Sequence, residues 1–383
     1  MSAVVLLAVN DFPPLLGGEA TLYHALARHL RPEEALVLAP RAPGDAAVDG
    51  RLAVPVVRRW LPEHGGVPRR LARSLLAGAH IAALLARRRV RYIVCGQLLS
   101  LGAPIRLLAG LAGIPYAVIV HGADVADYHD RPLWGRMARW VVSGAEVVLA
   151  NSGFTLGLLE RLLPGAARRA VVLPLGVDPA RPVEEARLAG LRERYRIEEG
   201  PVLLTVARLV PMKGQDTVIR GLPRLLERFP ALTYLVVGRG EHRESLERLA
   251  RETGVASRVV FAGGVPAEEL PAHYALATLF VQLSRATGGY DGLEGFGLSF
   301  LEAASHGLPC IAGKSGGVPE AVEDGQSGLL IPPEDPEAFV RAAAGLLADP
   351  DERSRMSRAA RRWAAAHPWE RSAACLRSLL GAA

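Results

Sequence analysis

Long apolar runs and cysteine are both scarce in this chain of 383 residues. The start, MSAVVLLAVND, has no basic segment and its apolar run stops at Asn10, so we expect no signal peptide. The best candidate for a membrane span, residues 107–120, contains Pro115 and several glycines and is too short to cross a bilayer. The three cysteines form no C-x-x-C pair, which indicates neither a disulfide framework nor a zinc site and favours a reducing compartment. We therefore expect a cytoplasmic protein, either free or peripheral on the inner face of the membrane.

Motifs of several other protein classes are also absent. The glycine-rich loop after the first predicted strand lacks G-x-G-x-x-G, which disfavours a dinucleotide-dependent oxidoreductase. Apart from Asp349-Pro350-Asp351, which follows a predicted helix, there is no D-x-D motif, and there is no His/Asp cluster with the spacing of metal ligands, so we expect neither a metal requirement nor a cofactor. The basic regions contain no interleaved aromatic residues or known motif, so we expect no nucleic-acid partner.

The first half of the chain holds all of the excess of positive over negative charge. Residues 1–180 carry 20 arginines and 13 acidic residues, a net charge of +7, whereas residues 181–383 carry 25 basic and 26 acidic residues. Residues 51–91 contain ten arginines and one acid, Glu63, and the centre of this segment has helical spacing. The pattern suits either a packed helix with solvated arginine ends or a helix at an anionic membrane surface. Both interpretations remain open.

Short apolar runs alternate with helical patterns along the whole chain. Strands are predicted at residues 4–9, 116–120, 145–150, 201–206, 232–238, 258–263, 277–283 and 309–313. This alternation predicts an α/β fold of parallel sheets with helices on both faces. The pattern restarts after residues 174–185, which are rich in proline and charge, so we expect two doubly wound, Rossmann-like domains facing across a cleft. We place them at residues 1–178 and 179–365, with a C-terminal helix at 366–383 returning toward the first domain.

Two loops after predicted strands offer sites for an anion. Gly17 and Gly18 precede a helix, where backbone without side chains lets an anion approach helix N–H groups, although a tight turn alone would also need glycine. Arg208 and Lys213 bracket a loop before a helix that begins at Gln215, and two cations at a helix N-terminus can neutralise a diphosphate.

Lysine is rarer still than cysteine, and its two positions carry some information. Of the 45 basic residues only Lys213 and Lys314 are lysines, which leaves 43 arginines. A compact ammonium differs from a planar guanidinium, so a lysine that survives this bias is a mild indication of function. Chance remains an alternative for two isolated residues.

The segment EGFGLSFLE, residues 294–302, places two glutamates eight positions apart. Along a helix eight residues rise roughly 12 Å, whereas glycosidase carboxyl pairs lie about 5–5.5 or 6.5–9.5 Å apart. The spacing therefore favours two contacts on one extended ligand, with Glu294 at one end, Glu302 at the other, and the amides of Gly297, Leu298 and Ser299 facing a phosphate. A capping loop followed by a surface glutamate is the structural alternative.

A histidine follows the predicted strand 116–120 in the segment HGADV. His121 at a strand end is often only a satisfied polar residue, but with Gly122 and Asp124 beside it at a cleft a functional role is favoured. In contrast, Asn151 or Ser152 is predicted to be a structural helix N-cap.

In this order the loops resemble those of retaining glycosyltransferases of family GT4, which have the GT-B fold. The matching segments span almost the whole chain: the Gly17–Gly18 loop, HGAD, PLGVD, RLVPMKGQD, FAGGV, the pair Glu294 and Glu302, and SGGVPEAVEDGQSGLLIPPEDPE. The segments DFPPLLGG and RATGGYDGLEGFG are also similar to bacterial phosphatidylinositol mannosyltransferases of the second, GDP-mannose-using step. The longer of these loops is expected to shape the donor or acceptor pocket.

The resemblance implies a role for each candidate residue that binds the donor. Glu302 would bind the nucleotide ribose and Glu294 the hydroxyls of the donor sugar. Arg208 and Lys213 would hold the diphosphate, assisted by the amides near Gly17–Gly18 and residues 297–299.

For the rest of the site the resemblance implies that His121 lies near the transferred sugar and the acceptor hydroxyl. Gly264 and Val265 would flank the base. The first domain would bind the acceptor and the second the nucleotide sugar. Hexosyl transfer would retain the anomeric configuration by a front-face mechanism that needs no enzymic nucleophile and, in general, no metal.

The leading hypothesis is transfer of mannose from GDP-mannose to a lipid-linked or glycan acceptor, at an anionic membrane surface bound through residues 51–91. One alternative keeps the chemistry with a UDP-hexose and a polysaccharide or small-molecule acceptor. Another is a nucleotide-sugar isomerase or a non-catalytic binding protein on the same fold. The presence of Arg208, Lys213, Glu294 and Glu302 together argues against a protein that has lost catalysis.

Overall fold

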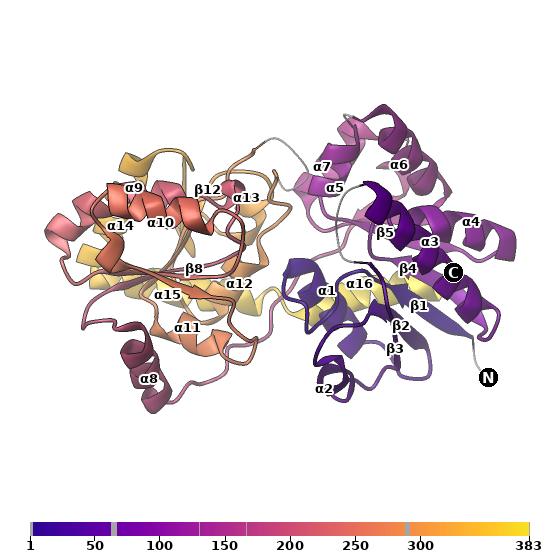
Figure 1. Ribbon diagram of the computed structural model, residues 1–383, viewed down its shortest axis with the longest axis horizontal. Helices are drawn as coiled ribbons and strands as arrows, with labels where there is room; N and C mark the ends of the chain where they lie inside the picture. Colours follow the sequence, from indigo (N-terminus) through magenta and orange to yellow (C-terminus); the bar gives the residue numbers. More distant parts are fainter. Residues whose placement is uncertain (1–2, 63–66, 130, 166, 288–291, 383) are drawn as a thin grey trace. The chain divides into compact units, whose positions relative to one another are not determined.

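The computed structural model of the chain describes residues 3–62, 67–129, 131–165, 167–287 and 292–382. They form two compact units, unit 1 (Met1–Leu175 with Trp369–Ala383) and unit 2 (Gly176–Pro368). Each unit contains one parallel sheet with helices packed against it, as the elements in Figure 1 show. The predicted α/β fold of two doubly wound domains is confirmed.

Unit 1 is built on a sheet with the strand order β3-β2-β1-β4-β5-β6-β7. The strands are β1 (Val4–Ala8), β2 (Ala35–Pro40), β3 (Val56–Arg59), β4 (Val90–Cys95), β5 (Tyr116–Val120), β6 (Val147–Ala150) and β7 (Ala170–Val172). The helices are α1 (Gly18–Arg28), α2 (Asp45–Asp49), α3 (Val67–Leu85), α4 (Gly102–Ala112), α5 (Ala123–His129), α6 (Pro132–Gly144), α7 (Gly153–Leu162), the short η1 (Ala167–Arg169) and α16 (Trp369–Ala382).

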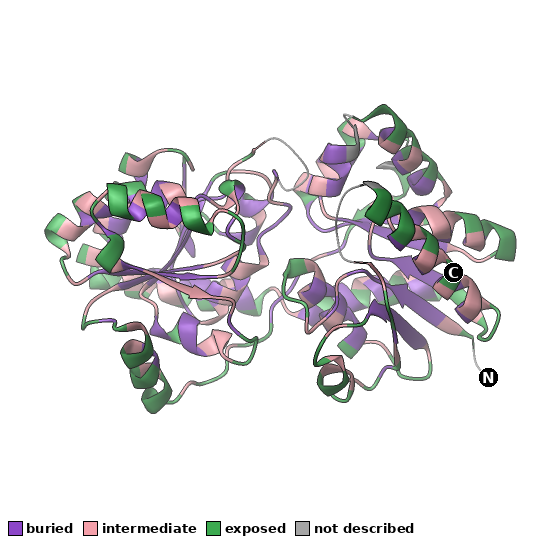
Figure 2. Cartoon of the chain, in the orientation of Figure 1, coloured by how far each residue is buried: buried purple, intermediate pink, exposed green. Residues whose placement is uncertain are grey.

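The strands between the two edges of the unit 1 sheet are largely buried because they consist mainly of apolar residues that are covered on both faces, whereas the edge strands β3 and β7 are more exposed. In Figure 2 the inner strands are mostly purple, while the outward sides of the helices are green. Helix α1 contacts α16, and α3, α4 and α6 contact one another in series. Ser152 accepts a hydrogen bond from the backbone N–H of Thr155 at 3.0 Å, which confirms Ser152 as the predicted N-cap.

Unit 2 is built on a sheet with the order β10-β9-β8-β11-β12-β13. Its strands are β8 (Val202–Val206), β9 (Thr233–Val237), β10 (Val259–Gly263), β11 (Leu279–Gln282), β12 (Cys310–Gly313) and β13 (Gly328–Ile331). Its helices are α8 (Glu185–Tyr195), η2 (Pro211–Lys213), α9 (Gln215–Arg228), α10 (Arg243–Glu252), η3 (Ala256–Arg258), α11 (Leu270–Leu276), α12 (Leu298–Ser305), α13 (Val318–Ala321), α14 (Pro336–Ala348) and α15 (Pro350–Ala365).

The core of unit 2 depends on close contacts between helices as well as on the buried strands. A Cβ atom at Gly221 of α9 would lie 2.6 Å from the ring of Phe339 on α14, so glycine is needed for this approach. Phe339 itself is fully buried. Residues 173–184, which precede α8, form neither helix nor strand apart from an isolated bridge between Val177 and Pro368.

Every apolar run predicted as a strand forms one, and each differs by at most two residues at either end. The structure adds strands β2, β3, β4, β7 and β13. All the pairings in both sheets are parallel, so the loops after the strands of each sheet leave from one edge.

Candidate active site

In unit 2 the chain topology reverses between β8 and β11. The chain runs from β8 outward to β9 and β10, then returns to place β11 on the other side of β8. In open α/β sheets the crevice at such a point, beyond the carboxyl ends of the strands, is the usual ligand site. Lys213 follows β8, and Gln282 ends β11, so both lie at this point.

The predicted residues Lys213 and Glu294 contact each other directly. The Lys213 ammonium donates to Glu294 Oε2 at 2.5 Å, and the two side chains are only 14% and 11% exposed. The same carboxylate oxygen accepts from Gln282 Nε2 at 3.1 Å and from Ser284 Oγ at 3.0 Å. The structure therefore holds a charge pair inside a hydrogen-bonded cluster, where a ligand with phosphate and hydroxyl groups can find partners of both signs.

Gly214 fixes the position of Lys213 relative to β11. Gly214 has φ 71° and forms the N-cap of α9. A Cβ atom there would lie 2.0 Å from the carbonyl oxygen of Leu283. Both this clash and the positive φ exclude a residue with a side chain. Glycine thus lets the loop after β8 pass directly against the end of β11.

The loop that carries Glu294 is held by the glycine pair after β12. The N–H of Gly317 donates to the carbonyl oxygen of Glu294 at 2.9 Å. Cβ atoms at Gly316 and Gly317 would lie 2.3 Å from the carbonyl oxygen of Glu294 and 2.0 Å from that of Gly295. These contacts explain the pair of glycines in the motif SGGVPEAV and keep Glu294 beside Lys213.

The N-terminus of α12 has the properties predicted for a phosphate site. Its N-cap, Gly297, has φ 96° and supplies no capping side chain, so no side chain at the N-cap position covers the amides of Leu298 and Ser299. Ser299 Oγ donates to Gln282 Oε1 at 3.2 Å, and this bond joins the helix to the Lys213–Glu294 cluster. The helix ends at Ser305, just before Gly307, which has φ 74°.

Glu302 occupies a separate position on α12. Its Oε2 accepts a hydrogen bond from the Tyr274 hydroxyl of α11 at 2.6 Å, and the Tyr274 ring stacks on His306 with centroids 5.3 Å apart. Burial raises the pKa of the Glu302 carboxyl, while the Tyr274 hydrogen bond lowers it in part. Among the described residues Glu294 is bound by Lys213, Gln282 and Ser284, whereas Glu302 is bound by Tyr274, so the two carboxyls have different hydrogen-bond partners.

The other predicted residues of unit 2 lie at neighbouring strand ends. Arg208 is exposed after β8, and its carbonyl oxygen accepts from Gln215 Nε2 at 3.1 Å. Gly264 and the buried Val265 follow β10. A Cβ atom at Gly264 would lie 2.7 Å from Nε of Arg239, a strand-end cation that the sequence analysis did not single out.

In unit 1 the predicted residues lie at the carboxyl edge of the central strands. Gly17 has φ 148° and begins α1 without a capping side chain, and Gly18 is the first residue of that helix. His121 follows β5, and its Nε2 lies 2.7 Å from the Tyr23 hydroxyl and 3.8 Å from Glu19 Oε2. The structure thus connects the Gly17–Gly18 helix to His121 through two side chains of α1.

A half-buried amide, that of Gln97, organises the same edge. Gln97, after β4, accepts from the N–H of Asn10 at 2.9 Å and donates to Glu19 at 2.8 Å and to Asp11 at 3.2 Å. These partners fix the orientation of the amide, because its oxygen must face the N–H group and its nitrogen the two carboxylates. Burial raises the pKa of Glu19, nearby His121 lowers it and nearby Asp11 raises it.

Several residues of these clusters were missed from the sequence, among them Glu19, Tyr23, Gln97, Tyr274, Gln282 and Ser284. A signal existed for the last two, since LFVQLS places two polar residues at the end of an apolar run. The loop residues 288–291 of RATGGYDGLEGFG lie outside the described residues, so its predicted role stays a prediction. Among the described residues no group of three or more His, Cys, Asp or Glu side chains could hold a metal ion.

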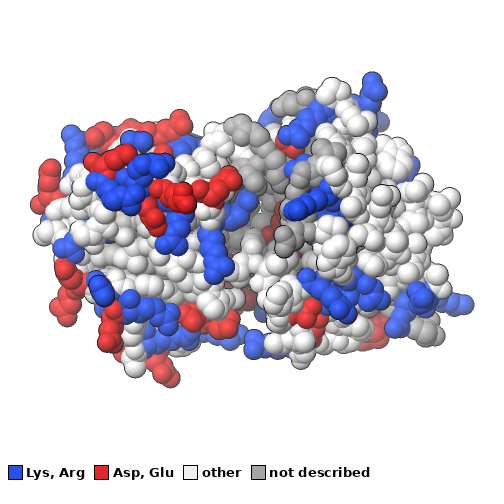
Figure 3. All heavy atoms as spheres, in the orientation of Figure 1, with Lys and Arg blue, Asp and Glu red and all other residues white. Residues whose placement is uncertain are grey.

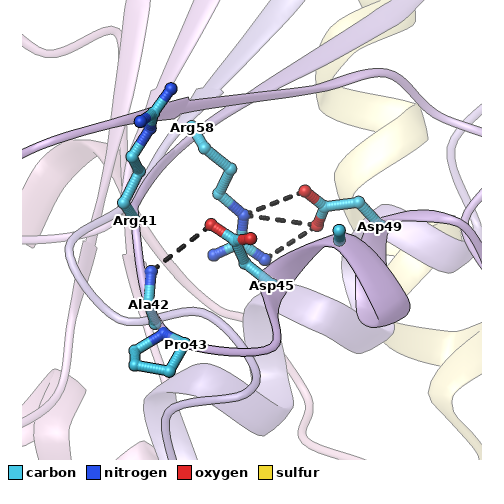
Figure 4. Close-up of a pocket in the computed structure, with 7 residues that line it drawn as sticks. Arg41, Ala42, Pro43, Asp45, Asp49 and Arg58 are labelled. Carbon is cyan, nitrogen blue, oxygen red and sulfur yellow. Dashed lines mark hydrogen bonds and ion pairs between the residues drawn. The ribbon is translucent and has the colours of Figure 1, made fainter.

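A cavity of about 460 Å³ in unit 1 contains none of the predicted site residues. Figure 4 shows its lining and the hydrogen bonds of Arg58 to Asp49. The Arg58 guanidinium also donates to the carbonyl oxygens of Pro40 at 2.9 Å and Pro13 at 2.6 Å. Because Arg58 is buried and fully paired, it ties β3 to its neighbours and is not one of the exposed arginines expected in residues 51–91.

Two family models match the chain. "Glycosyl transferases group 1" matches residues 191–363, and "Glycosyl transferase 4-like domain" matches residues 17–176. The chain is 37% identical over 368 residues to a GDP-mannose-dependent alpha-(1-6)-phosphatidylinositol monomannoside mannosyltransferase of Mycolicibacterium smegmatis, covering 94% of this chain and 93% of the relative. It is 35% identical over 386 residues to the protein of that name from Mycobacterium tuberculosis, covering 98% and 97%.

Among solved structures, Anabaena HepE in complex with UDP and glucose superposes with a TM-score of 0.84 at 20% identity over all of both chains. At this identity the likeness concerns the fold, and it agrees with the two Rossmann-like units described above.

Proposed function

This chain belongs to the family of group 1 glycosyltransferases, and from that premise we propose that it transfers mannose from GDP-mannose to a lipid-linked acceptor with retention of configuration. The observation that carries the proposal is the cluster of Lys213, Glu294, Gln282 and Ser284 at the point where the topology of unit 2 reverses. The names of relatives that match nearly the whole chain support mannose as the sugar and a phosphatidylinositol mannoside as the acceptor.

In this proposal the residues of unit 2 hold the donor. Lys213 and the uncapped amides of α12 stabilise the negative charge that develops on the leaving diphosphate. Glu294 gives up part of its contact with Lys213 and accepts hydrogen bonds from the mannose hydroxyls. Glu302 accepts from the ribose hydroxyls, Arg208 contacts the diphosphate, and Gly264 and Val265 flank the base.

In unit 1 His121 and the amides near Gly17 and Gly18 face the transferred sugar and the acceptor hydroxyl. The departing phosphate takes the proton of that hydroxyl, so the chemistry asks for no nucleophile from the protein. We propose that neither a cofactor nor a metal is required.

The function is tested by thermal unfolding with GDP, UDP and ADP, followed by transfer assays with the matching sugar nucleotides. A ligand at 100 times its Kd stabilises by about 2.7 kcal/mol, which raises the Tm by several degrees. We expect this shift with GDP, and mannose transfer from GDP-mannose to phosphatidylinositol monomannoside in vesicles. A shift with UDP alone would replace the proposal with the UDP-hexose alternative. A GDP shift without transfer to any acceptor would favour the binding protein or isomerase.

A surface of unit 1 supports the membrane as a partner. The three helices in series, α3, α4 and α6, contain no aspartate or glutamate. They expose large apolar side chains, among them Leu75 at 76% and Leu111 at 79% exposure, together with arginines. In Figure 3 the part of unit 1 over α3 and α4 is white with scattered blue.

In the described chain no helix is long and apolar enough to cross a bilayer. An acid-free, apolar and basic surface suits the interface of an anionic membrane, peripheral to its inner face.

One of the three arginines on α3 does not face solvent and cannot contribute to binding of a membrane. Arg73 is buried, and its guanidinium donates to the carbonyl oxygens of Pro62 and of Asn10, the latter at 3.0 Å. Its place on α3 points it toward the loop after β1, so it cannot meet a lipid. Arg69 and Arg70 on the same helix are exposed.

Replacing Arg69 and Arg70 with Gln should weaken binding to vesicles of phosphatidylcholine and phosphatidylinositol. At about 1 kcal/mol for each arginine the partition coefficient should fall about thirtyfold, measured by sedimentation. The matched control is Arg88 and Arg89 to Gln, which removes two exposed arginines beyond the end of α3. Equal losses of vesicle binding in both variants would mean that the net charge of the protein determines binding and that no particular surface does. Unchanged binding of the Arg69 and Arg70 variant would contradict the membrane proposal.

A further inference from the structure

We propose that Tyr23 is a positioning residue that decides which ring nitrogen of His121 carries the proton. It holds Nε2 in the N–H form and so leaves Nδ1 as a hydrogen-bond acceptor for a substrate hydroxyl. The claim that Nδ1 accepts from a substrate hydroxyl rests on the proposed function, in which His121 faces the sugar. The claim that Nε2 carries the proton rests on the hydrogen bonds of unit 1 alone.

The neighbours of Nε2 are groups that accept hydrogen bonds. The carbonyl oxygen of Gly96 lies 3.2 Å from it and Glu19 Oε2 lies 3.8 Å from it. A carbonyl oxygen can only accept. Glu19 Oε2 already accepts from Gln97 Nε2 at 2.8 Å, so this oxygen also acts as an acceptor. An unprotonated Nε2 would place a lone pair against these oxygens.

The Tyr23 hydroxyl completes the assignment. It lies 2.7 Å from Nε2 and also contacts the carbonyl oxygen of Gly96. The hydroxyl has one proton and two neighbours. The ring nitrogen of His121 can carry a proton of its own, whereas the carbonyl oxygen of Gly96 cannot, so the hydroxyl donates its proton to Gly96. The phenol oxygen must then accept from the ring. The result is a directed chain from Nε2–H of His121 through the hydroxyl of Tyr23 to the carbonyl of Gly96.

The opposite side of the imidazole is available to a ligand. No residue in the described part of the chain forms a hydrogen bond with Nδ1, and the side chain is 12% exposed. The main chain is fixed separately, because the N–H of His121 donates to Asp124 Oδ1 at 2.9 Å. Tyr23 itself is fully buried, and its ring meets the imidazole edge-on with centroids 5.9 Å apart. In the neutral ring, the nitrogen without a hydrogen-bond partner among the described residues is therefore the one with the lone pair.

This arrangement gives the reaction a preference among substrate atoms. When Nε2 carries the proton, Nδ1 accepts a hydrogen bond from a substrate hydroxyl, and the lone pairs of that oxygen point away from the ring. When Nδ1 carries the proton, it would instead donate to the same oxygen. Without the Tyr23 hydroxyl, Nε2–H would keep only the Gly96 carbonyl at 3.2 Å and Glu19 Oε2 at 3.8 Å, so the preference for this tautomer should weaken and the Nδ1–H form should gain population. The loss of the hydroxyl should therefore reduce turnover without removing any group that touches the substrate.

The test is Tyr23→Phe, which keeps the buried ring and removes the hydroxyl. The control is Tyr92→Phe on β4, whose buried hydroxyl has no partner in the described structure. The full-length protein is labelled with ¹⁵N-histidine, the His121 signals are assigned by their absence in His121→Gln, and the ring ¹⁵N shifts report which nitrogen is protonated. Steady-state transfer from GDP-mannose is measured on the same samples.

We expect an Nε2–H ring in the wild type and in Tyr92→Phe, and mixed tautomers in Tyr23→Phe. The turnover of Tyr23→Phe should fall about fivefold, the worth of one ordinary hydrogen bond, with little change in KM for the donor. A wild-type ring protonated on Nδ1, or identical shifts in Tyr23→Phe, would overturn the proposal whatever the activity. Mixed tautomers with unchanged turnover would support the role of Tyr23 in holding the proton and would remove His121 from the transfer step.

Discussion

Lys213→Met is expected to lower kcat for mannose transfer by two to three orders of magnitude. The ammonium lies at the junction of β8 and β11, where it is largely buried and bound to Glu294. Removing one preorganised donor that stabilises developing negative charge typically costs about 10²–10³ in kcat. The measurement is steady-state transfer with saturating GDP-mannose, and KM for the donor should change less than kcat.

The other lysine of the chain provides the matched control. Lys314 is exposed just after β12, so Lys314→Met removes the same charge from the same edge of the same sheet. Its kcat should stay within about twofold of the wild type, since a screened surface charge has little effect. If both variants lose activity equally, the overall electrostatic potential of unit 2 affects the rate, and the proposed direct role of Lys213 is contradicted.

A double variant separates catalysis from stability. In Lys213→Met the Glu294 carboxylate loses its charged partner and keeps its bonds from Gln282 and Ser284. Adding Glu294→Gln removes the unpaired charge, so the Tm should recover in the double variant. Turnover should not recover, because Glu294→Gln by itself is expected to lower kcat. Recovery of both would make the pair a structural element only.

Glu302→Ala is expected to weaken the binding of GDP and GDP-mannose alike by one to two orders of magnitude. A hydrogen bond to a charged group is worth about 1.5–3 kcal/mol, and a ribose presents two hydroxyls to the carboxylate. Isothermal titration of both ligands measures the effect. Glu294→Gln is the comparison, because it should leave free GDP binding close to that of the wild type. Loss of GDP-mannose binding alone in Glu302→Ala would move this glutamate to the sugar end of the donor.

Tyr274→Phe adds a test through pH. Burial raises the pKa of Glu302 and the Tyr274 hydrogen bond offsets part of that rise, so removing the hydroxyl should raise the pKa further. The ionised carboxylate is the form that accepts from both ribose hydroxyls. GDP affinity should therefore fall as the pH falls through the folded-state pKa, and in Tyr274→Phe this loss should begin at higher pH. Comparing the two proteins with one nucleotide cancels the titration of its phosphate.

The strands that could be predicted are those whose apolar runs are long and uninterrupted. β3 contains Arg58 and β4 contains Arg91, and each arginine breaks the pattern of a buried strand even though Arg58 is buried by its pairing with Asp49. β7 has three residues, too few for any periodicity. Strand β2, ALVLAP, is different: it is entirely buried and was recognisable as an apolar run.

The candidate site divides in the same way. Lys213, Glu294 and the glycines could be predicted because charge and glycine gather in loops that follow strands. Tyr23 and Tyr274 lie inside helices, where a tyrosine looks like any other core residue. Each becomes part of a site only when the fold brings it to His121 or to Glu302, and no local pattern in one sequence records that meeting.

The last helix has a consequence for how this protein is made. α16 contacts α1, its Leu376 and Leu380 are buried, and the carbonyl oxygen of Leu380 accepts from Arg91 at 2.7 Å. Unit 1 therefore consists of two stretches of chain, one synthesised before unit 2 and one after it. On the ribosome, unit 2 can complete its fold while unit 1 still lacks a helix and exposes the apolar surface of α1. The order of maturation is thus the reverse of the order of translation, and a fragment that stops at Leu175 would leave that surface uncovered.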